Sequence, residues 1–201
     1  YDIRGKYPSE LNEEIAEKIG EAAGTYFLQK GRKLRPSILI CEDLRLSSRP
    51  LKESLVKGLI GQGINILDGG SVTTPFFYFL LDKIKPDGGI MVTASHNPAE
   101  YNGFKLQDKN LHTISLGSGL EVVQSYLEQK KAKPAEVSGE IEKLPDFSEE
   151  YLEFVSKGIK IESLRVVIDA AGGAEALFIQ RLLARFPKIL YKPLFFEPDG
   201  T

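Results

Sequence analysis

The chain has 201 residues, of which 42% are hydrophobic and 27% are charged, and its formal net charge is −2. These values describe an ordinary globular protein with room for one large domain, or for one domain and part of a second. The chain has no excess of basic residues that would predict binding to nucleic acid or to an anionic membrane. No apolar run approaches the ~20 residues that cross a bilayer. A single cysteine, Cys41, and an amino terminus without the layout of a signal peptide predict a reducing, cytoplasmic location.

Both ends of the sequence lack the features of a natural terminus. The chain begins at Tyr1 without an initiator methionine and ends in the turn-like segment Glu197-Pro-Asp-Gly-Thr201. We therefore expect a fragment of a longer protein.

Apolar periodicity and breaker residues predict alternating helices and strands up to Val92. The predicted elements, in chain order, are a helix from Leu11 with Asn12 as its N-cap, a strand over 37–41, a loop over 43–48, a helix from Pro50 to about Gly61 capped by Ser47 or Ser48, a strand over 64–67, a turn over 68–70, an aromatic helix entered at 73–75, and a buried strand over 89–92. Such alternation is typical of a parallel sheet that helices cover on both faces.

The pattern is weaker in the rest of the chain and divides it near residue 145. The predicted elements are a flexible point over 117–119, a helix over 120–131, a linker or exposed edge over 131–145, a helix over 147–157, a strand over 164–169, a glycine turn at 172–173, a helix over 174–186 and a strand over 189–196. The last of these form one βαβ unit, which buries only one face of its sheet. We therefore expect a complete domain over 1–145. Residues 146–201 would be the incomplete start of a second, similar α/β domain that packs on the first, self-associates or frays.

The hexapeptide Thr93-Ala-Ser-His-Asn-Pro98 directly follows a buried strand, and the carboxyl ends of strands are where open α/β sheets bind ligands. Asn102-Gly103 predicts a tight turn that brings Lys105 back beside Ser95. The expected neighbours of Ser95 are cations and hydrogen-bond donors, namely His96, Asn97, Lys105, and Arg4 or Arg45. Such surroundings suit a serine that carries or transfers a phosphoryl group.

Two other interpretations stay open from these residues alone. Ser95 beside His96 invites a serine hydrolase, although no G-x-S-x-G elbow surrounds it. In loops of this composition, a serine more often serves only to form a turn. In that case Lys105 is a solvated lysine at a strand edge and Arg4 belongs to a surface salt bridge.

Five motifs, in order, resemble the amino-terminal half of the α-D-phosphohexomutases. They are Tyr1-Asp-Ile-Arg-Gly5, Asp43-Leu-Arg-Leu-Ser-Ser48, Val72-Thr-Thr-Pro75, Thr93-Ala-Ser-His-Asn-Pro98 and Tyr101-Asn-Gly-Phe-Lys105. The match spans nearly all of 1–145. Tyrosine at position 101, before Asn102-Gly103, resembles the pattern of the phosphomannomutase/phosphoglucomutase branch. The resemblance implies a mixed, mainly parallel sheet sandwiched by helices. It also implies an isomerase, an intramolecular phosphotransferase that interconverts hexose 1-phosphate and 6-phosphate through a phosphoserine and a bisphosphate, with Mg²⁺.

Carried over residue by residue, the resemblance implies that Ser95 is phosphorylated and that its phosphate supplies one metal ligand. Lys105 corresponds to a proton-transfer partner and Arg4 to a residue that orients phosphate or polarises a hydroxyl. The remaining implied site residues are the catalytic His96 and the substrate contacts Tyr1, Asn97 and Asn102.

Two positions depart from the family's pattern. Cys41-Glu42 stands where Gly-Arg is usual, which reverses one charge, and Gly172-Gly173 stands where Asn-Gly is common. These departures keep open a second hypothesis, a non-catalytic sugar-phosphate-binding or structural module with the same fold. The family's metal, sugar and second phosphate loops would lie beyond Thr201. We therefore expect the fragment alone to be inactive, with small sugar phosphates as its partners.

Overall fold

The computed structural model describes residues 2–31, 33–129 and 132–200, which form two compact units, 1–144 and 145–201. Each unit is described by itself below. No helix among the described residues is both long and apolar enough to cross a membrane.

Unit 1 is built on a mixed sheet whose described strands follow the order β1-β5-β4-β2-β3-β7, with β6 paired to β5. The strands are β1 (Ile3–Lys6), β2 (Ser37–Glu42), β3 (Asn65–Ser71), β4 (Gly88–Val92), β5 (Tyr101–Asp108), β6 (Thr113–Ile114) and β7 (Ile141–Lys143). β4, β2, β3 and β7 run parallel, whereas β5 is antiparallel to β4, β1 and β6. This arrangement confirms the predicted mixed α/β fold with a parallel centre.

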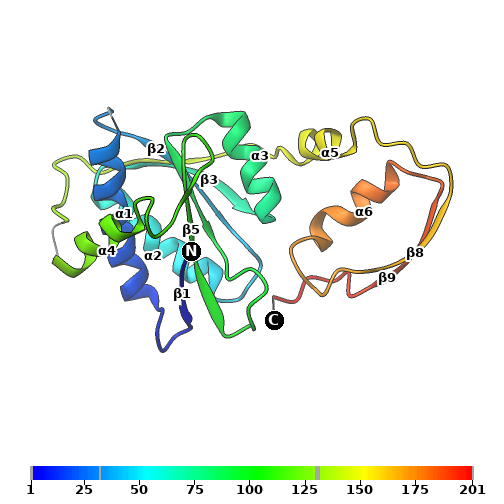
Figure 1. The fold of residues 1–201 in the computed structure, drawn as a ribbon, viewed down its shortest axis with the longest axis horizontal. Coiled ribbons are helices and arrows are strands. Elements are labelled where there is room, and N and C mark those ends of the chain that lie inside the picture. The colour runs from blue at the N-terminus through cyan, green and yellow to red at the C-terminus, as the bar shows by residue number, and fades with distance from the viewer. Residues whose placement is uncertain (1, 32, 130–131, 201) are drawn as a thin grey trace. The chain divides into compact units, whose positions relative to one another are not determined.

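Helices cover both faces of this sheet (Figure 1). They are α1 (Glu13–Lys30), α2 (Ser48–Gly61), α3 (Thr74–Ile84) and α4 (Leu120–Gln129). α1, α2 and α4 share one core with the alternate strand residues Ile38, Ile40, Ile90 and Val92. The residues between them face α3, and a Cβ on Gly89 would lie only 2.7 Å from Leu81 Cδ2. Period-two alternation in β2 and β4 thus provides one buried layer on each side of the sheet.

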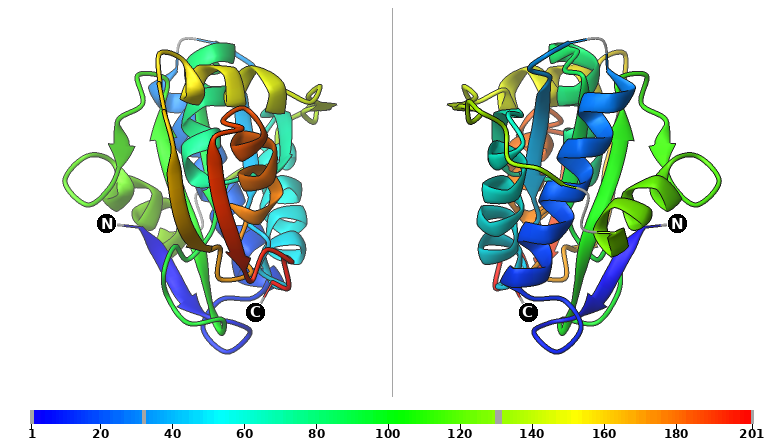
Figure 2. Two further views of the ribbon diagram at one scale, coloured as in Figure 1. Left: turned by 90° about the vertical axis from the view of Figure 1, so that its right-hand side faces the viewer. Right: turned by 90° about the vertical axis from the view of Figure 1, so that its left-hand side faces the viewer.

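The close approach of α1 to α2 depends on two glycines. A Cβ on Gly20 would lie 2.2 Å from the Leu55 carbonyl oxygen, and one on Gly58 would lie 2.1 Å from that of Glu17. Figure 2 shows α1 and α2 side by side along the sheet. Because α2 begins directly after the loop over 43–48, this contact fixes where that loop leaves the sheet.

Several predicted boundaries are confirmed by the capping contacts. Asn12 accepts a hydrogen bond from the Ile15 N–H at the start of α1, and Thr73 accepts one from the Phe76 N–H at the start of α3. α2 begins at Ser48, and its N-cap Ser47 makes no side-chain cap bond, because both hydroxyls bind elsewhere. α4 is described as far as Gln129, so the last two residues of the predicted helix lie outside the described residues.

Two predicted turns are wrong, because glycine there serves close packing inside strands. Asp68-Gly-Gly70 belongs to β3, where the register against β2 shifts and a Cβ on Gly69 would meet Cys41 Sγ at 2.5 Å. Asn102-Gly103 lies within β5, and a Cβ on Gly103 would lie 2.1 Å from the Ile3 carbonyl oxygen of β1. The chain instead reverses in the loop over 93–100. For the segment over 131–145, predicted as a linker or an exposed edge, the exposed edge is confirmed by the strand β7, which pairs with β3.

Unit 2 contains α5 (Ser148–Ser156), β8 (Leu164–Asp169), α6 (Ala176–Ala184) and β9 (Ile189–Leu194). β8 and β9 pair in parallel, as the predicted βαβ unit requires. α5 and α6 contact each other through an edge-to-face pair of Tyr151 and Phe178. Apolar side chains of the two strands, such as Val167 and Leu190, remain exposed.

Candidate active site

The serine loop, residues 93–100, joins β4 to β5 at the carboxyl end of β4. Ser95 and His96 are exposed at this loop, whereas Thr93 and Ala94 before them are buried. Ser95 has a φ of 59°, in the left-handed region that non-glycine residues seldom adopt. Its backbone N–H donates to Thr93 Oγ1 at 2.9 Å. A strained backbone at an exposed serine is a feature that functional loops often carry.

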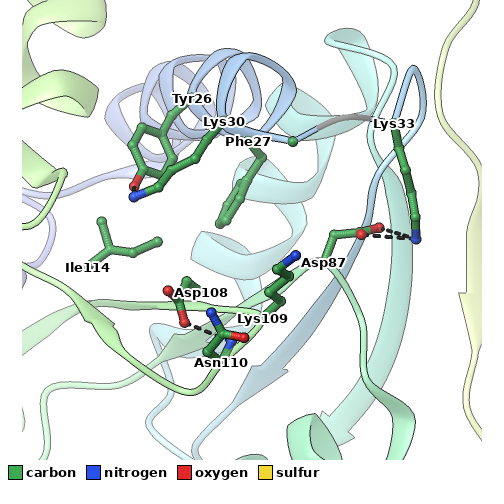
Figure 3. A pocket seen from close by; sticks show the side chains of 10 residues that line it. Tyr26, Phe27, Lys30, Lys33, Asp87, Asp108, Lys109, Asn110 and Ile114 are labelled. Carbon is green, nitrogen blue, oxygen red and sulfur yellow. Dashed lines mark hydrogen bonds and ion pairs between the residues drawn. The ribbon is translucent and has the colours of Figure 1, made fainter.

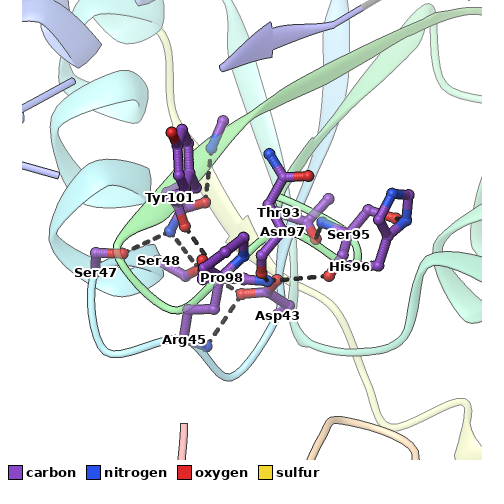
Figure 4. Close-up of polar contacts among 12 residues, drawn as sticks. Asp43, Arg45, Ser47, Ser48, Thr93, Ser95, His96, Asn97, Pro98 and Tyr101 are labelled. Atoms are coloured by element: carbon purple, nitrogen blue, oxygen red, sulfur yellow. Dashed lines mark hydrogen bonds and ion pairs between the residues drawn. The ribbon is translucent and has the colours of Figure 1, made fainter. Parts of the chain in front are cut away.

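A second loop, residues 43–48, holds the serine loop through Arg45. The Arg45 guanidinium donates hydrogen bonds to the carbonyl oxygens of Ser95, Asn97, Pro98 and Tyr101, at 2.6–3.1 Å. Figure 4 shows Arg45 beneath the serine loop, next to Asp43. The Arg45 side chain is only 14% exposed. The sequence suggested Arg45 only as a cationic neighbour of Ser95, and these carbonyl contacts join residues 50 to 56 positions apart.

Asn102 makes the second connection between these two loops. It is fully buried, and its carboxamide nitrogen donates to the hydroxyl oxygens of Ser47 and Ser48 at 2.8 and 2.9 Å. Its carboxamide oxygen accepts from the Gly103 N–H. The amide is therefore occupied inside the protein, and what Asn102 does here is hold the two loops together.

Arg4 and Lys105, from β1 and β5, both contact the Asp2 carboxylate. Arg4 Nη2 lies 3.0 Å and Lys105 Nζ lies 3.3 Å from Asp2 Oδ2. Arg4 Nη1 also donates to Asn97 Oδ1 at 2.9 Å, which links this group to the serine loop. The antiparallel pairing of β5 with both β4 and β1 brings these residues together, rather than the predicted turn. Asp2 was not singled out from the sequence, and Tyr1 lies outside the described residues.

His96 provides only a weak partner for Ser95. Its Nδ1 lies 3.4 Å from Ser95 Oγ, both side chains are exposed, and none of the ion pairs of the described residues involves His96. A serine hydrolase needs a histidine that a third group orients. The described geometry does not provide that arrangement.

The charge of Glu42, the conspicuous departure in the sequence, is balanced by Lys52 of α2. Lys52 Nζ lies 3.0 Å from Glu42 Oε2 and 2.8 Å from Asp68 Oδ1, and both Glu42 and Lys52 are buried. Burial lowers the pKa of Lys52, but the hydrogen bond to Asp68 and the charges of both carboxylates outweigh it, so that pKa is raised. Glu42 thus forms part of a buried ionic cluster that ties the end of β2 to β3 and α2.

The described residues do not by themselves form a metal site. No group of three or more His, Cys, Asp or Glu side chains among them is placed to hold a metal ion. A hard cation such as Mg²⁺ requires about six oxygen ligands. One phosphate on Ser95 would supply only part of that set, so the residues present do not fit the implied metal.

A separate cavity of about 580 Å³ lies at the opposite end of β4 from Ser95, between α1 and the β5–β6 hairpin. Several of its charged side chains contact other groups of the protein (Figure 3). Lys30 donates to the Tyr26 hydroxyl at 2.8 Å, and Lys33 pairs with Asp87 at 2.9 Å. Asp108 accepts from the backbone N–H of Asn110 in the adjoining turn. The residues that line this cavity include no serine and none of the residues of the serine loop.

Comparison with known proteins points to one family. A family model described as phosphoglucomutase/phosphomannomutase, alpha/beta/alpha domain I, matches residues 1–133. A phosphomannomutase of Vibrio cholerae is 38% identical over 189 residues, which are 92% of this chain and 40% of that protein. A phosphoglucosamine mutase of Limosilactobacillus reuteri is 32% identical, over 98% of this chain and 45% of that protein. The chain thus spans about two fifths of the length of the curated relatives that it matches.

Solved structures agree with these relatives. A phosphoglucomutase/phosphomannomutase family protein from Burkholderia thailandensis matches with a TM-score of 0.85 and 29% identity, over 100% of this chain and 44% of that one. A putative phosphomannomutase from Thermus thermophilus matches with a TM-score of 0.81 and 25% identity, over 98% and 45% of the two chains. Both similarities extend over unit 1 and unit 2.

Proposed function

The chain belongs to the phosphoglucomutase/phosphomannomutase family, and from this premise we propose that it carries the serine-loop part of the active site of a phosphohexomutase. The proposed reaction interconverts hexose 1-phosphate and hexose 6-phosphate through a phosphoserine and a bisphosphate. The observation that carries the proposal is the placement of Ser95. It is an exposed serine in a left-handed loop conformation, with two cationic side chains joined to its loop through Asp2 and Asn97.

In the proposed chemistry the phosphoryl group moves from Ser95 Oγ to a free hydroxyl of a sugar monophosphate. The bond between phosphorus and Ser95 Oγ breaks, a bond to the sugar oxygen forms, and the proton of the sugar hydroxyl is passed on so that the serine hydroxyl is regenerated. The other phosphate of the bisphosphate then returns to Ser95. Cations are needed throughout, because charge on the transferring group must be stabilised in the transition state.

Three side chains have proposed roles around that transfer. Lys105 is the proton-transfer partner, since an amine can both release and take up a proton, whereas the Arg4 guanidinium stays charged and orients phosphate. Asn97 accepts from Arg4 and so couples the loop to that cation. We assign Asn102 to positioning, because its amide is buried and occupied.

The proposal leaves part of the site to residues outside this chain. Mg²⁺ is the expected cofactor, but its remaining ligands and the sugar contacts are not among the described residues, so this chain alone should be inactive as a mutase. Burial raises the pKa of the Cys41 thiol, which keeps it protonated. The proposed reducing, cytoplasmic location rests on the single cysteine, which has no second cysteine in this chain to form a disulfide.

Phosphate analysis at Ser95 tests the proposal. In the full-length protein, tandem mass spectrometry of the peptide that contains Ser95 should find phosphoserine, and Ser95→Ala should abolish both the phosphate and mutase turnover. Ser125→Ala, whose hydroxyl lies on α4 and contacts Gln129, is the matched control and should keep both. Full turnover in Ser95→Ala would contradict the mechanism. Unmodified Ser95 in a parent protein without turnover would favour the second hypothesis, a non-catalytic module that binds sugar phosphates.

Substitutions of Lys105 test its role in proton transfer. Lys105→Met should lower kcat more than it raises KM, because a proton-transfer group acts chiefly in the transition state, by roughly 10²–10⁴-fold. Lys105→Arg should also lower kcat, since a guanidinium does not release its proton. Lys109→Met, at an exposed lysine four positions away, is the control. A kcat near the parent value in both Lys105 variants would show that Lys105 is only a surface charge without a role in proton transfer.

A further inference from the structure

Arg45 gathers three backbone carbonyls of the serine loop and that of Tyr101, the first residue of β5, around one guanidinium group. Nη1 donates to the Pro98 and Tyr101 oxygens at 2.8 and 3.1 Å, and Nη2 donates to the Ser95 and Asn97 oxygens at 3.0 and 2.6 Å. These are four separate peptide groups from a stretch of seven residues. A mostly buried cation therefore fixes the direction in which the peptide dipoles of this loop point.

The Arg45 side chain is itself held in place. Its Nε lies 3.4 Å from Asp43 Oδ2, while Asp43 Oδ1 accepts from the Arg45 N–H at 3.1 Å and from the Ser48 hydroxyl. A guanidinium has five donors in a rigid planar fork, whereas an ammonium is a single compact charge. Lysine at this position would keep the charge and lose the fork.

The direction of these carbonyls also sets the direction of the amides. In a trans peptide the C=O and the next N–H point in opposite directions. Since the Ser95 and Pro98 carbonyls point at Arg45, the N–H groups of His96 and Ala99 point away from it. Neither of these two N–H groups donates a hydrogen bond to any of the described residues. In Figure 4, Arg45 and the His96 ring lie on opposite sides of the serine loop.

We propose that Arg45 is a positioning residue that turns the carbonyls of the serine loop inward, so that the His96 and Ala99 backbone N–H groups are presented to a phosphoryl group on Ser95. Arg45 makes no contact with that group. It removes acceptor oxygens from the phosphate side and leaves donors there, and backbone donors of this kind bind phosphate well. This inference rests on the proposed phosphorylation of Ser95 and adds the residue on which the loop's anion-binding geometry depends.

Nuclear magnetic resonance of the chain with phosphoserine installed at position 95 during translation tests the proposal. The second ionisation of a phosphoserine occurs near pH ~6. We expect the His96 amide proton to move downfield as the phosphate becomes a dianion, because a charged acceptor strengthens that hydrogen bond. The unphosphorylated chain, titrated in parallel, is the reference for shifts that do not come from the phosphate. The charged and titratable side chains linked, directly or through one another, to the side chains of Ser95 and Asn97 are those of His96, Arg4, Lys105 and Asp2.

Arg45→Lys should reduce this phosphate-dependent shift to less than half, even though the charge is kept. Arg49→Lys is the matched control, because Arg49 is 81% exposed and, among the described residues, pairs with Glu53 on its own helix. Amide signals of β2 and β4 report whether each variant is folded. A shift in Arg45→Lys equal to that of the parent chain would overturn the proposal.

If Arg45→Lys does not fold, the parent chain still decides the matter. Absence of a phosphate-dependent shift at both His96 and Ala99 in the parent would also overturn the proposal. Because the phosphate is installed rather than acquired, the result does not depend on mutase activity. Lack of natural phosphate on Ser95 would contradict only the proposed function.

Discussion

The two units of this chain use similar segments but bury their strands to different degrees. In unit 1, β2 lies between β3 and β4, and its residues 38–42 are all buried, since helices cover both faces of the sheet. In unit 2, β8 pairs only with β9 among the described strands, and Val167 in its middle is 64% exposed. The difference shows that a strand–turn–helix sequence provides local structure in both places. A closed core requires strand neighbours on both edges and helices on both faces.

The same difference separates the polar clusters of unit 1 from that of unit 2. In unit 1 the Lys52 cluster is mostly out of contact with water, and the Arg45 contacts are nearly so. In unit 2 Glu149 accepts from Arg181 and Arg185 at 2.7 Å each, but it is 69% exposed. Solvent screens exposed pairs, so only the clusters of unit 1 are expected to hold backbone segments firmly.

A matched pair of leucine substitutions should show the largest contrast. Leu39→Ala in β2 removes a side chain that is 0% exposed and should lower the free energy of unfolding by about 2–5 kcal/mol, through lost burial and the cavity left behind. Leu190→Ala in β9 removes one that is 58% exposed and should cost less than about 1 kcal/mol. Urea denaturation followed by circular dichroism measures both. Equal costs would mean that the exposed strands of unit 2 are covered in solution.

The buried cation of unit 1 should have the next largest effect. Lys52→Met leaves Glu42 and Asp68 without their cation and should cost about 3 kcal/mol, at the lower end of the range for broken buried pairs because the Asp68 side chain is 27% exposed. Lys57→Met, on the same helix but 72% exposed, is the control and should cost less than about 1 kcal/mol.

The Lys52 effect should also depend on pH in a defined direction. Since the pKa of Lys52 is raised on folding, its stabilisation is fully present below the unfolded value of about 10.4 and is lost as the pH rises through the higher folded value. The difference in urea midpoint between the parent chain and Lys52→Met should therefore shrink above that pH. A difference that stays constant up to pH 11 would contradict the charge pairing.

Hydrogen exchange should give the smallest contrast, and it sharpens the comparison strand by strand. We expect backbone amides of β8 and β9 to exchange at least about tenfold faster than those of β2 and β4, because fewer buried contacts oppose their opening. Protection of β8 and β9 that rises with protein concentration would indicate self-association through unit 2. Protection that is equal in both units and independent of concentration would contradict the comparison.

Local sequence alone determined most of the secondary structure. Apolar periodicity and caps such as Asn12 and Thr73 act over three or four residues, so they could be recognised without knowledge of the fold. The strand before Ser95 and the polar loop after it were predicted in the same way. Alternation of strands and helices indicated a parallel sheet, whereas the mixed sheet was implied by the motif resemblance.

Only the tertiary structure decided what several of these residues do. Asn102-Gly103 carries the signature of a turn, yet it lies inside β5, because a buried amide and a close backbone approach favour the same two residues. Arg45 reaches carbonyls 50 to 56 positions away, and Lys52 pairs with both Glu42 and Asp68 across three elements. These contacts depend on which strands become neighbours, and the order β1-β5-β4-β2-β3-β7 is set by packing of the whole unit rather than by any local pattern.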